Sequence, residues 1–244
     1  MDRVVYDRMN ELEARHWWFV SRRKVIAALI DRMPQAWPDF AILEAGCGTG
    51  GNLLTLAHYG KVDAFEYDAT ARQQAIEKTK MDVCFGALPD EVPFDGRRYD
   101  LIGLFDVLEH VEADVASLAA LRELLSDRGV ILVTVPAFQW LWSQHDERHH
   151  HMRRYTRASL AEAARKAGLK VRYSSYFNFF LFPAAIAMRT FKRLSGSSTP
   201  DDTMPRPFVN RILTAVFSSE RHLIGRIRLP VGLSLAAVLE KAEG

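Results

Sequence analysis

Residues 42–52 read ILEAGCGTGGN, in which an apolar run ending in a glutamate and an alanine is followed by four glycines within six positions. Glycines directly after a strand allow a tight turn, and the free amide groups at the start of the following helix face the ligand. Gly46, Gly48 and Gly51 also satisfy the GxGxxG spacing of dinucleotide-binding sites. The stretch therefore predicts a ligand site where backbone passes close to the ligand at the end of a strand.

Two carboxylates bear on the identity of that ligand. Glu44 ends the strand two residues before the first glycine, where its charge would repel a pyrophosphate and attract a ligand with ammonium and sulfonium cations, such as S-adenosylmethionine. Glu66 ends the next apolar run, 20 residues after Gly46, where a carboxylate accepts hydrogen bonds from both ribose hydroxyls. Because dinucleotides and S-adenosylmethionine both contain a ribose, Glu66 indicates a nucleoside but does not distinguish between these two ligands. S-adenosylmethionine is favoured, and an NAD(P)- or FAD-dependent oxidoreductase stays open as an alternative.

From Phe40 onward, short apolar runs alternate with helical patterns, which is typical of a parallel sheet with crossover helices. The predicted strands are 41–44, 62–65, 82–85, 99–105, 130–135, 169–176 and 231–239. The predicted helices are 50–58, 70–79, 113–125, 157–167 with Thr156 as N-cap, and 208–223. This order indicates an α/β domain.

The chain divides into four predicted parts. Apolar positions recur at helical spacing from residue 4 to residue 33, before Pro34 and Pro38, and predict one or two amphipathic helices. Residues 195–207 are rich in Ser, Gly, Pro and Asp and predict a loop or linker. We expect an N-terminal helical lid at 1–38, a ligand-binding core at 39–176, a helical insertion at 177–228 and a final strand at 229–244 that completes the core sheet.

Composition excludes several classes of protein. The 244 residues are 48% hydrophobic and 25% charged, as in ordinary globular domains. Two cysteines, outside any CxxC or zinc spacing, exclude a disulfide framework and a structural zinc site. A net charge of +2 gives no reason to expect nucleic acid as a partner. Without a signal peptide or an apolar run long enough to span a bilayer, we expect a cytoplasmic protein.

Much of the chain resembles the class I S-adenosylmethionine-dependent methyltransferases, in particular bacterial members of methyltransferase type 11/12 near the ubiquinone-biosynthesis O-methyltransferases. The segments that carry the resemblance are LEAGCGTG (43–50), FEYD (65–68), GALPDEVPF (86–94), YDLIGLFDVLEHVEAD (99–114), RGVILVTVPA (128–137), HDERHHHMRRYT (145–156) and VGLSLAAV (231–238). The resemblance implies a Rossmann-like, seven-stranded, mostly parallel sheet with helices on both faces and the last strand antiparallel.

The resemblance also implies a set of positions that bind S-adenosylmethionine. Glu44, Gly46 and Gly48 would line the methionine moiety, and Glu66 would bind the ribose. The remaining positions are Tyr67 beside the adenine, Leu88 over the adenine ring, Phe105 at the methionine end and Arg22 at the cofactor carboxylate. Gly86 and Ala87 depart from the family pattern, because many members carry an acidic residue just before the position of Leu88.

Methylation of a hydroxyl requires that the acceptor be brought to near-attack distance and lose its proton. Candidate bases follow the fourth and fifth predicted strands, at the edge where ligands bind in doubly wound sheets. We expect the base to be His110, His145 or His151. The alternatives are that Glu109 and His110 support the following helix and that the histidine run is a solvated loop. Arg153 and Arg154 either bind an anionic substrate group or form ion pairs with Asp146 or Glu147.

A divalent metal is a further hypothesis. Asp106, Glu109, His110 and His151 resemble the carboxylate and histidine set of small-RNA 2′-O-methyltransferases, and such mixed ligands suit Mg, Mn or Zn.

Residues 175–194, SYFNFFLFPAAIAMRTFKRL, combine aromatic and apolar residues with trailing cations. This segment is too short to span a bilayer. It fits peripheral membrane contact through 177–194 at the inner face of the membrane, the wall of a pocket for an apolar acceptor, or a helix packed on the sheet. Altogether the sequence predicts O-methylation of a small aromatic, sugar or lipid-linked acceptor. Besides the oxidoreductase, the alternative is a non-catalytic S-adenosylmethionine-binding protein; the oligomeric state stays open.

Overall fold

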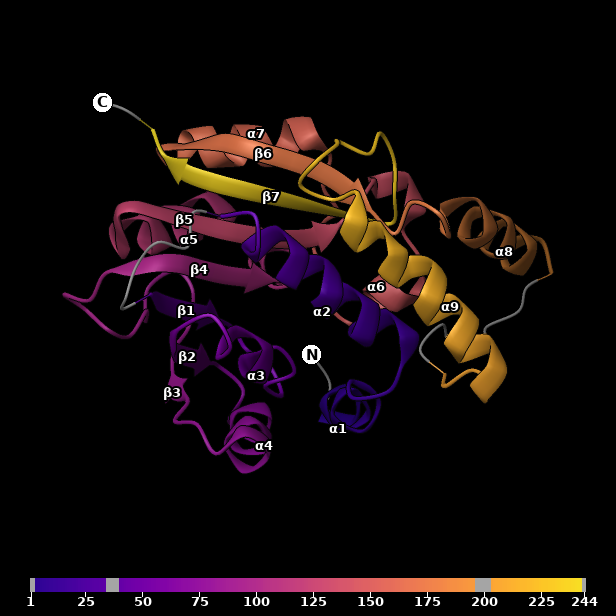
Figure 1. Cartoon of the computed structure of the whole chain (residues 1–244), viewed down its shortest axis with the longest axis horizontal. Helices are drawn as coiled ribbons and strands as arrows, with labels where there is room; N and C mark the ends of the chain where they lie inside the picture. Colours follow the sequence, from indigo (N-terminus) through magenta and orange to yellow (C-terminus); the bar gives the residue numbers. More distant parts are fainter. Residues whose placement is uncertain (1–2, 34–39, 196–202, 243–244) are drawn as a thin grey trace.

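The computed structural model describes residues 3–33, 40–195 and 203–242, and its centre is one seven-stranded sheet (Figure 1). In spatial order the strands are β3 (Cys84–Phe85), β2 (Lys61–Glu66), β1 (Ala41–Ala45), β4 (Tyr99–Phe105), β5 (Leu125–Pro136), β7 (Ser234–Lys241) and β6 (Leu169–Phe177). The first five run parallel, and β7 is antiparallel to both of its neighbours. The predicted fold is confirmed.

Helices cover both faces of the sheet. In chain order they are α1 (Arg3–Leu12), α2 (Trp17–Ile30), α3 (Leu53–Leu56), α4 (Ala69–Thr79), α5 (Asp114–Glu123), α6 (Gln144–Arg148), α7 (Arg157–Lys166), α8 (Phe182–Ser195) and α9 (Pro207–Ser219). Three short 3₁₀ helices, η1 (Leu108–His110), η2 (Gln139–Leu141) and η3 (Glu220–His222), lie in the connections. No helix in these described ranges is long and apolar enough to cross a membrane.

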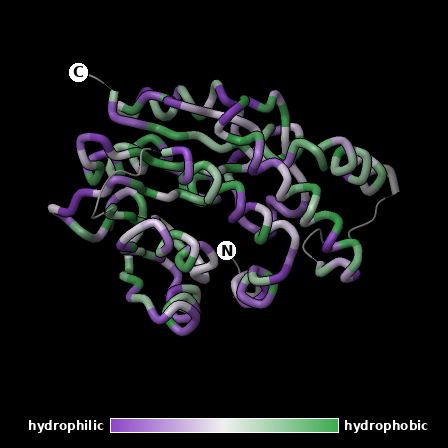
Figure 2. The backbone as a smooth tube through the Cα atoms, in the orientation of Figure 1, coloured by the Kyte–Doolittle hydropathy of each residue, from purple (hydrophilic) through white to green (hydrophobic). Residues whose placement is uncertain are grey.

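Side chains of β4 and β5 alternate between the two faces, and both faces are apolar because helices bury both. Leu101 and Leu132 pack with α2 and with Phe217 of α9, whereas Ile102 and Ile131 pack with α5 and α7. A third cluster joins α3 and α4 to β2. Figure 2 shows the hydrophobic residues concentrated along the central strands, where these clusters lie.

Several predicted elements differ from the observed ones. Strand β5 begins at Leu125, five residues before the predicted start, and helix α9 ends at Ser219, four residues before the predicted end. The helix expected at 50–58 is only the single turn α3, because the chain is still in a glycine turn at Gly50, where φ is +81°. The strand expected at 82–85 has two paired residues at the sheet edge. The last strand begins at Ser234, three residues later than expected. Pro34, Pro38 and residues 196–202 of the predicted linker lie outside the described residues.

Helix α2 of the N-terminal part and helix α9 of the insertion before β7 lie side by side on one face (Figure 1). Trp17 and Trp18 of α2 contact the Phe217 ring, with centroids 6.0 and 5.5 Å away. The Trp17 amide donates to Asn210 over 2.9 Å, at the other end of α9. Residues 17–30 and 207–219 thus form one packed layer at the carboxyl ends of β1 and β4. The domain boundaries themselves stay predictions.

Candidate methyl-donor and acceptor site

The glycine turn after β1 is fixed by the carboxylate that ends β2. Glu66 is buried, and its two oxygens accept hydrogen bonds from the Gly48 amide over 2.8 Å and the Asp68 amide over 2.9 Å. Burial raises the pKa of Glu66. Gly48 has φ +55°, and a Cβ placed there would meet nothing within 4 Å. The turn therefore faces open space beside a pre-positioned carboxylate.

Glu44, at the end of β1, lies buried next to this turn. Asn52 donates to Glu44 Oε1 over 2.8 Å, and Oε2 has no hydrogen-bond partner among the described residues. Burial raises the pKa of Glu44 to about 7, against the opposing effect of the Asn52 hydrogen bond and of nearby Arg22. A buried carboxylate oxygen without a partner is costly unless a ligand satisfies it. The ammonium group of S-adenosylmethionine has the right charge and donors for this position.

Arg22 reaches the same region from α2. Its guanidinium donates to the Asp106 carboxylate at the end of β4. Burial lowers the pKa of Arg22 to about 10, although the charges of Glu44 and Glu109 act in the opposite direction. One cation thus lies among the carboxylates of Glu44, Asp106 and Glu109. The expected contact of Arg22 with the carboxylate of a methionine moiety stays a prediction.

The predicted adenine side is more open. The Tyr67 side chain is 70% exposed, and its ring centroid lies 6.1 Å from that of Phe85 on the edge strand β3. Leu88 is partly buried in the loop that follows. Phe105 is different, because its ring is buried in the cluster between the sheet and α2. Any role of Phe105 toward a ligand is therefore carried by its backbone or by a small exposed edge.

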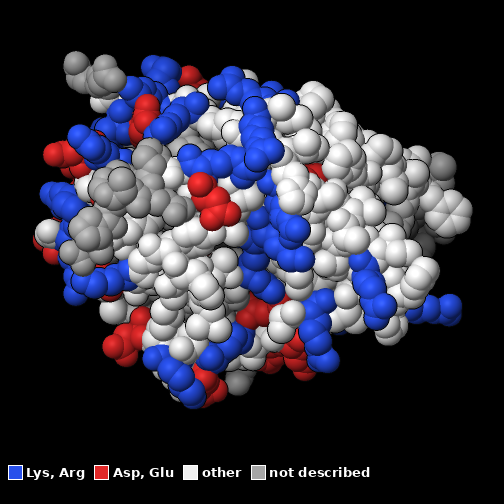
Figure 3. Space-filling model, viewed as in Figure 1, with Lys and Arg blue, Asp and Glu red and all other residues white. Residues whose placement is uncertain are grey.

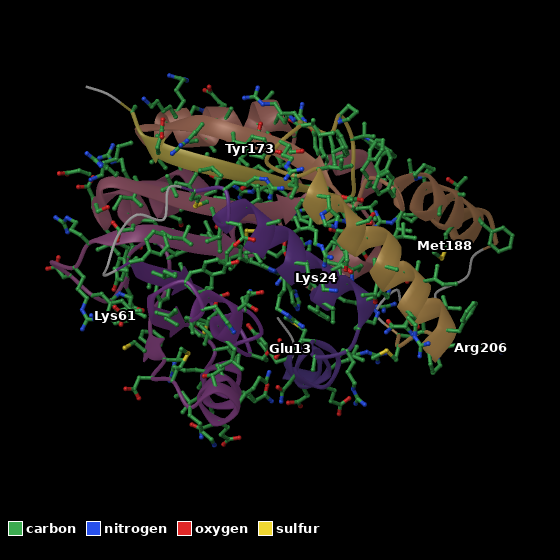
Figure 4. The ribbon with its side chains drawn as sticks, viewed as in Figure 1. Glu13, Lys24, Lys61, Tyr173, Met188 and Arg206 are labelled. Atoms are coloured by element: carbon green, nitrogen blue, oxygen red, sulfur yellow. The ribbon has the colours of Figure 1, made fainter. Side chains whose placement is uncertain are left out.

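Three residues near the glycine turn were not predicted as site residues. Glu13, just after α1, is buried and accepts hydrogen bonds from Thr49 Oγ1 over 2.9 Å and from the Lys78 ammonium group of α4. Lys78 also donates to the Thr49 carbonyl over 2.8 Å. A Cβ on Gly51 would collide with the Glu13 carboxylate. We call Glu13, Thr49 and Lys78 the clamp; Figure 4 shows Glu13 beside α1.

The clamp places α1 over the predicted cofactor region. Burial raises the pKa of Tyr6 on α1, and the negative charges of Glu66 and Asp68 raise it further. The sequence holds no local sign of this arrangement, since Glu13 and Lys78 are 65 positions apart.

The acceptor side is centred on three predicted residues that the structure brings together. Glu109 and His110 lie on η1, and His151 lies in the loop after β5; one ligand atom from each lies within 4.8 Å of the others. The rings of His110 and His151 are 4.6 Å apart. Neither Glu109 oxygen has a hydrogen-bond partner in the described chain. Burial raises the pKa of Glu109 to about 8 and lowers that of His110 to about 3.

Asp106 does not belong to this group. Its carboxylate pairs with Arg22 and accepts from Thr134 Oγ1 over 3.3 Å. The predicted four-residue metal set is therefore corrected to Glu109, His110 and His151, because a cation from α2, 84 positions away in sequence, takes the fourth carboxylate.

His151 is oriented by a buried carboxylate. Asp146 Oδ1 lies 2.9 Å from His151 Nδ1, and Arg154 donates to both Asp146 oxygens over 2.8 Å. Ser143 completes the set with its amide, 2.8 Å from Oδ2, in the capping box of α6. Burial alone would raise the pKa of Asp146, but the hydrogen bonds from His151 and Arg154 lower it well below its usual range. Asp146 is thus an ionised acceptor, and Nδ1 of His151 carries the proton.

The other predicted residues of this loop lie farther out. The His145 ring stacks near His149, 4.0 Å away, and is 5.9 Å from His151. Arg153 pairs with Asp114 over 2.8 Å, and Arg154 pairs with Asp146 as described. Both arginines therefore follow the ion-pair alternative, although the partner of Arg153 is Asp114 instead of the two acids that the sequence suggested.

Comparison with known proteins agrees with this geometry. A family model described as a methyltransferase domain matches residues 18–174. The chain therefore belongs to the methyltransferase domain family, whose members use S-adenosylmethionine as the methyl donor. The family match gives no support to the oxidoreductase alternative. The ubiquinone-biosynthesis branch is not confirmed. No protein of curated function matches the sequence.

Solved structures share the fold at low identity. A chain of the complex between the Haloferax volcanii Trm112 methyltransferase activator and its methyltransferase is 20% identical, with 99% of this chain and 96% of that chain covered and a TM-score of 0.65. An S-adenosylmethionine-dependent methyltransferase from Clostridium acetobutylicum is 9% identical, with 91% and 92% covered and a TM-score of 0.61. The [4+2]-cyclase SpnF is 14% identical, with 91% and 82% covered and a TM-score of 0.58. These likenesses establish the fold alone.

Proposed function

We propose that the protein transfers a methyl group from S-adenosylmethionine to a hydroxyl oxygen of a small aromatic, sugar or lipid-linked acceptor, with His151 as the general base. The observation that carries this proposal is the pair formed by Asp146 and His151, 2.9 Å apart, beside Glu109 and His110 at the carboxyl ends of the parallel strands. A histidine whose Nδ1–H is held by a carboxylate presents Nε2 as the proton acceptor.

The residues around the glycine turn fit the methyl donor. Glu44 would pair with the ammonium group, Arg22 with the carboxylate, and Glu66 with the ribose hydroxyls. When bound, S-adenosylmethionine supplies an electrophilic methyl group on its sulfonium. The protein side of the reaction is to hold the acceptor hydroxyl in line and to remove its proton as the oxygen bonds to carbon.

A second candidate adds a divalent metal held by Glu109, His110 and His151. It is favoured by the spacing of their ligand atoms within 4.8 Å and by the two unpartnered oxygens of Glu109. The contact from Asp146 to His151 matches the carboxylate that commonly orients a metal-binding histidine. A metal held there would polarise the acceptor hydroxyl and lower its pKa, and the proton would then pass to solvent, because a metal-bound His151 Nε2 could not accept it.

The test compares His151→Ala and His149→Ala in a screen of hydroxylated acceptors. For an acceptor that wild type methylates, His151→Ala is expected to lower turnover about 100-fold or more, as loss of a general base does, with unchanged S-adenosylmethionine affinity by calorimetry. His149→Ala serves as the matched control from the same loop. Full turnover by His151→Ala would overturn the assignment, and cofactor binding without turnover on any acceptor would favour the non-catalytic alternative.

The metal candidate is tested on the purified protein by elemental analysis after equilibration with Mg, Mn or Zn. One equivalent of metal that is lost in Glu109→Gln, together with loss of turnover in chelator, would establish it. Full activity in chelator would rule it out and leave His151 as the base.

A further inference from the structure

Helix α8 turns an apolar stripe toward solvent. Ala184, Ala187, Met188 and Phe191 are exposed at spacings of three, one and three residues, and Met188 and Phe191 keep 56% and 69% of their side chains accessible. In a globular protein the apolar stripe of such a helix normally faces the core. In the view of Figure 4, Met188 extends from α8 on the side toward α9.

Helix α9 repeats the pattern. Its inner side carries Phe217, which packs on α2, while its first two turns also expose Phe208 at 71% and Ile212 at 46%. Arg206 and Arg211 lie among these apolar side chains and are exposed. Exposed apolar residues occur singly on most proteins, but exposed stripes on two helices of the same insertion indicate an interaction surface.

Cations without carboxylate partners continue this surface. A groove of about 720 Å³ lies between α2 and the segment after α9, and Lys24, Arg32, Arg221 and Arg226 line it. None of these four forms an ion pair within the described chain. The one acid in the groove, Asp31, accepts a hydrogen bond from Tyr59 over 2.9 Å.

The basic groove and the apolar helices lie on one face of the molecule. In Figure 3 the Lys and Arg atoms form a band across the middle of that face, and the area to its right, over α9 and α8, is largely uncharged. Figure 4 places Lys24 within this band, Arg206 at the start of α9 and Met188 beyond it. We call this surface, α8, α9 and the groove together, the docking face.

We propose that the docking face binds the surface of an anionic phospholipid bilayer, with Met188, Phe191, Phe208 and Ile212 entering the boundary of the acyl chains and the groove cations contacting the lipid phosphates. This rests on the proposed function in one respect, since it makes a lipid-linked acceptor the favoured substrate class. The sequence indicated only 177–194 for such a contact; α9 and the groove come from other parts of the chain.

The charges favour a bilayer over a second copy of the chain. A two-fold dimer through this face would bring like-charged grooves toward each other, which is unfavourable. An anionic membrane instead attracts each cation near its surface, and amphipathic segments with aromatic side chains lie in the interface plane. The same attraction weakens in high salt because exposed charges are screened.

The experiment is sedimentation of the full chain with vesicles of phosphatidylcholine alone or with 30% phosphatidylglycerol. Wild type is expected to bind the anionic vesicles at least 10-fold more strongly than the neutral ones. Phe191→Ser/Phe208→Ser and Arg221→Gln/Arg226→Gln are each expected to lower binding about 10-fold. Arg165→Gln/Lys166→Gln on α7, where both cations pair with Glu162, is the control of equal charge change.

Circular dichroism and S-adenosylmethionine affinity check that each variant is folded. Absence of binding to anionic vesicles, or binding unchanged by both double variants, overturns the proposal. A dimer in sedimentation velocity that Phe191→Ser/Phe208→Ser dissociates would instead assign the face to a second copy. Vesicle binding is measured without methyl donor or acceptor. A failure of the proposed methyl transfer would therefore not change the result of the vesicle experiment.

Discussion

At the residue scale, Glu44 is buried where a negative charge is unfavourable, yet the proposed binding of the donor's ammonium group requires that charge. Its carboxyl group has a pKa of about 7 in the folded chain against 4.5 as a free side chain. The folded state therefore binds the proton more tightly than the unfolded chain. The contribution of this group to the free energy of unfolding is complete below pH 4.5 and is lost as the pH rises through 7. The ammonium group of the methyl donor, in contrast, needs the ionised form.

Glu44→Gln is accordingly expected to have opposite effects on stability and binding. At pH 8 it should raise the free energy of unfolding by about 1–3 kcal/mol, because a neutral amide replaces a buried charge. It should weaken S-adenosylmethionine binding at least 10-fold at pH 8 and remove the rise in affinity that we expect for wild type between pH 6 and 8. Urea unfolding and calorimetry at pH 5, 6, 7 and 8 measure both effects. Identical pH profiles for the two proteins would contradict this assignment.

At the scale of elements, the clamp connects helix α1 to the glycine turn. Lys78→Met would leave Glu13 buried with only the Thr49 hydroxyl as a donor, and breaking one side of a buried ion pair is strongly destabilising. We expect α1 to detach, and S-adenosylmethionine to dissociate about 3- to 10-fold faster in stopped-flow measurements. Asp7→Asn, which weakens the exposed contact between α1 and Gln74 of α4, is the control. Equal dissociation rates in all three proteins would mean that α1 does not cover the cofactor.

The elements also show what sequence alone predicts. The extent of β4 follows from its nearly continuous apolar run, and Glu44 and Glu66 could be placed because each lies at the end of such a run. Predicting the positions of these two glutamates requires only the local sequence pattern and the rule that parallel strands end at the same edge of the sheet. Asp106 was placed with the metal ligands on a resemblance to small-RNA 2′-O-methyltransferases, but its partner in the structure is Arg22, on a helix whose register no local pattern fixes.

The role of Asp146 also could not be predicted from local sequence. In the sequence Asp146 is a possible ion-pair partner of Arg153 or Arg154, whereas its burial and its contact with His151 depend on the tertiary structure. Chemistry that depends on burial, such as the orientation of one histidine among four in this loop, becomes visible only once the loop has been placed against β4 and β5.

At the scale of the whole molecule, the ligand is expected to stabilise the fold. Binding at 100-fold excess over Kd adds about 2.7 kcal/mol, which corresponds to a rise in Tm of roughly 5–10 °C for a domain of this size. Thermal unfolding should show this rise with S-adenosylmethionine and none with NAD or FAD. Glu66→Ala should remove most of the rise, while Glu77→Ala on the exposed side of α4 should leave it intact. Stabilisation by a dinucleotide instead would revive the oxidoreductase alternative.

The strand order has a consequence for the synthesis of the chain. Since β7 lies between β5 and β6 and pairs with both, the sheet stays divided until residues 234–241 have left the ribosome. Until then β5 presents an unpaired apolar edge, a feature that promotes aggregation of incomplete chains. The nascent protein therefore reaches its native topology only after β7 has been translated. Slow translation of residues 234–241 would prolong the time during which β5 needs protection by a chaperone.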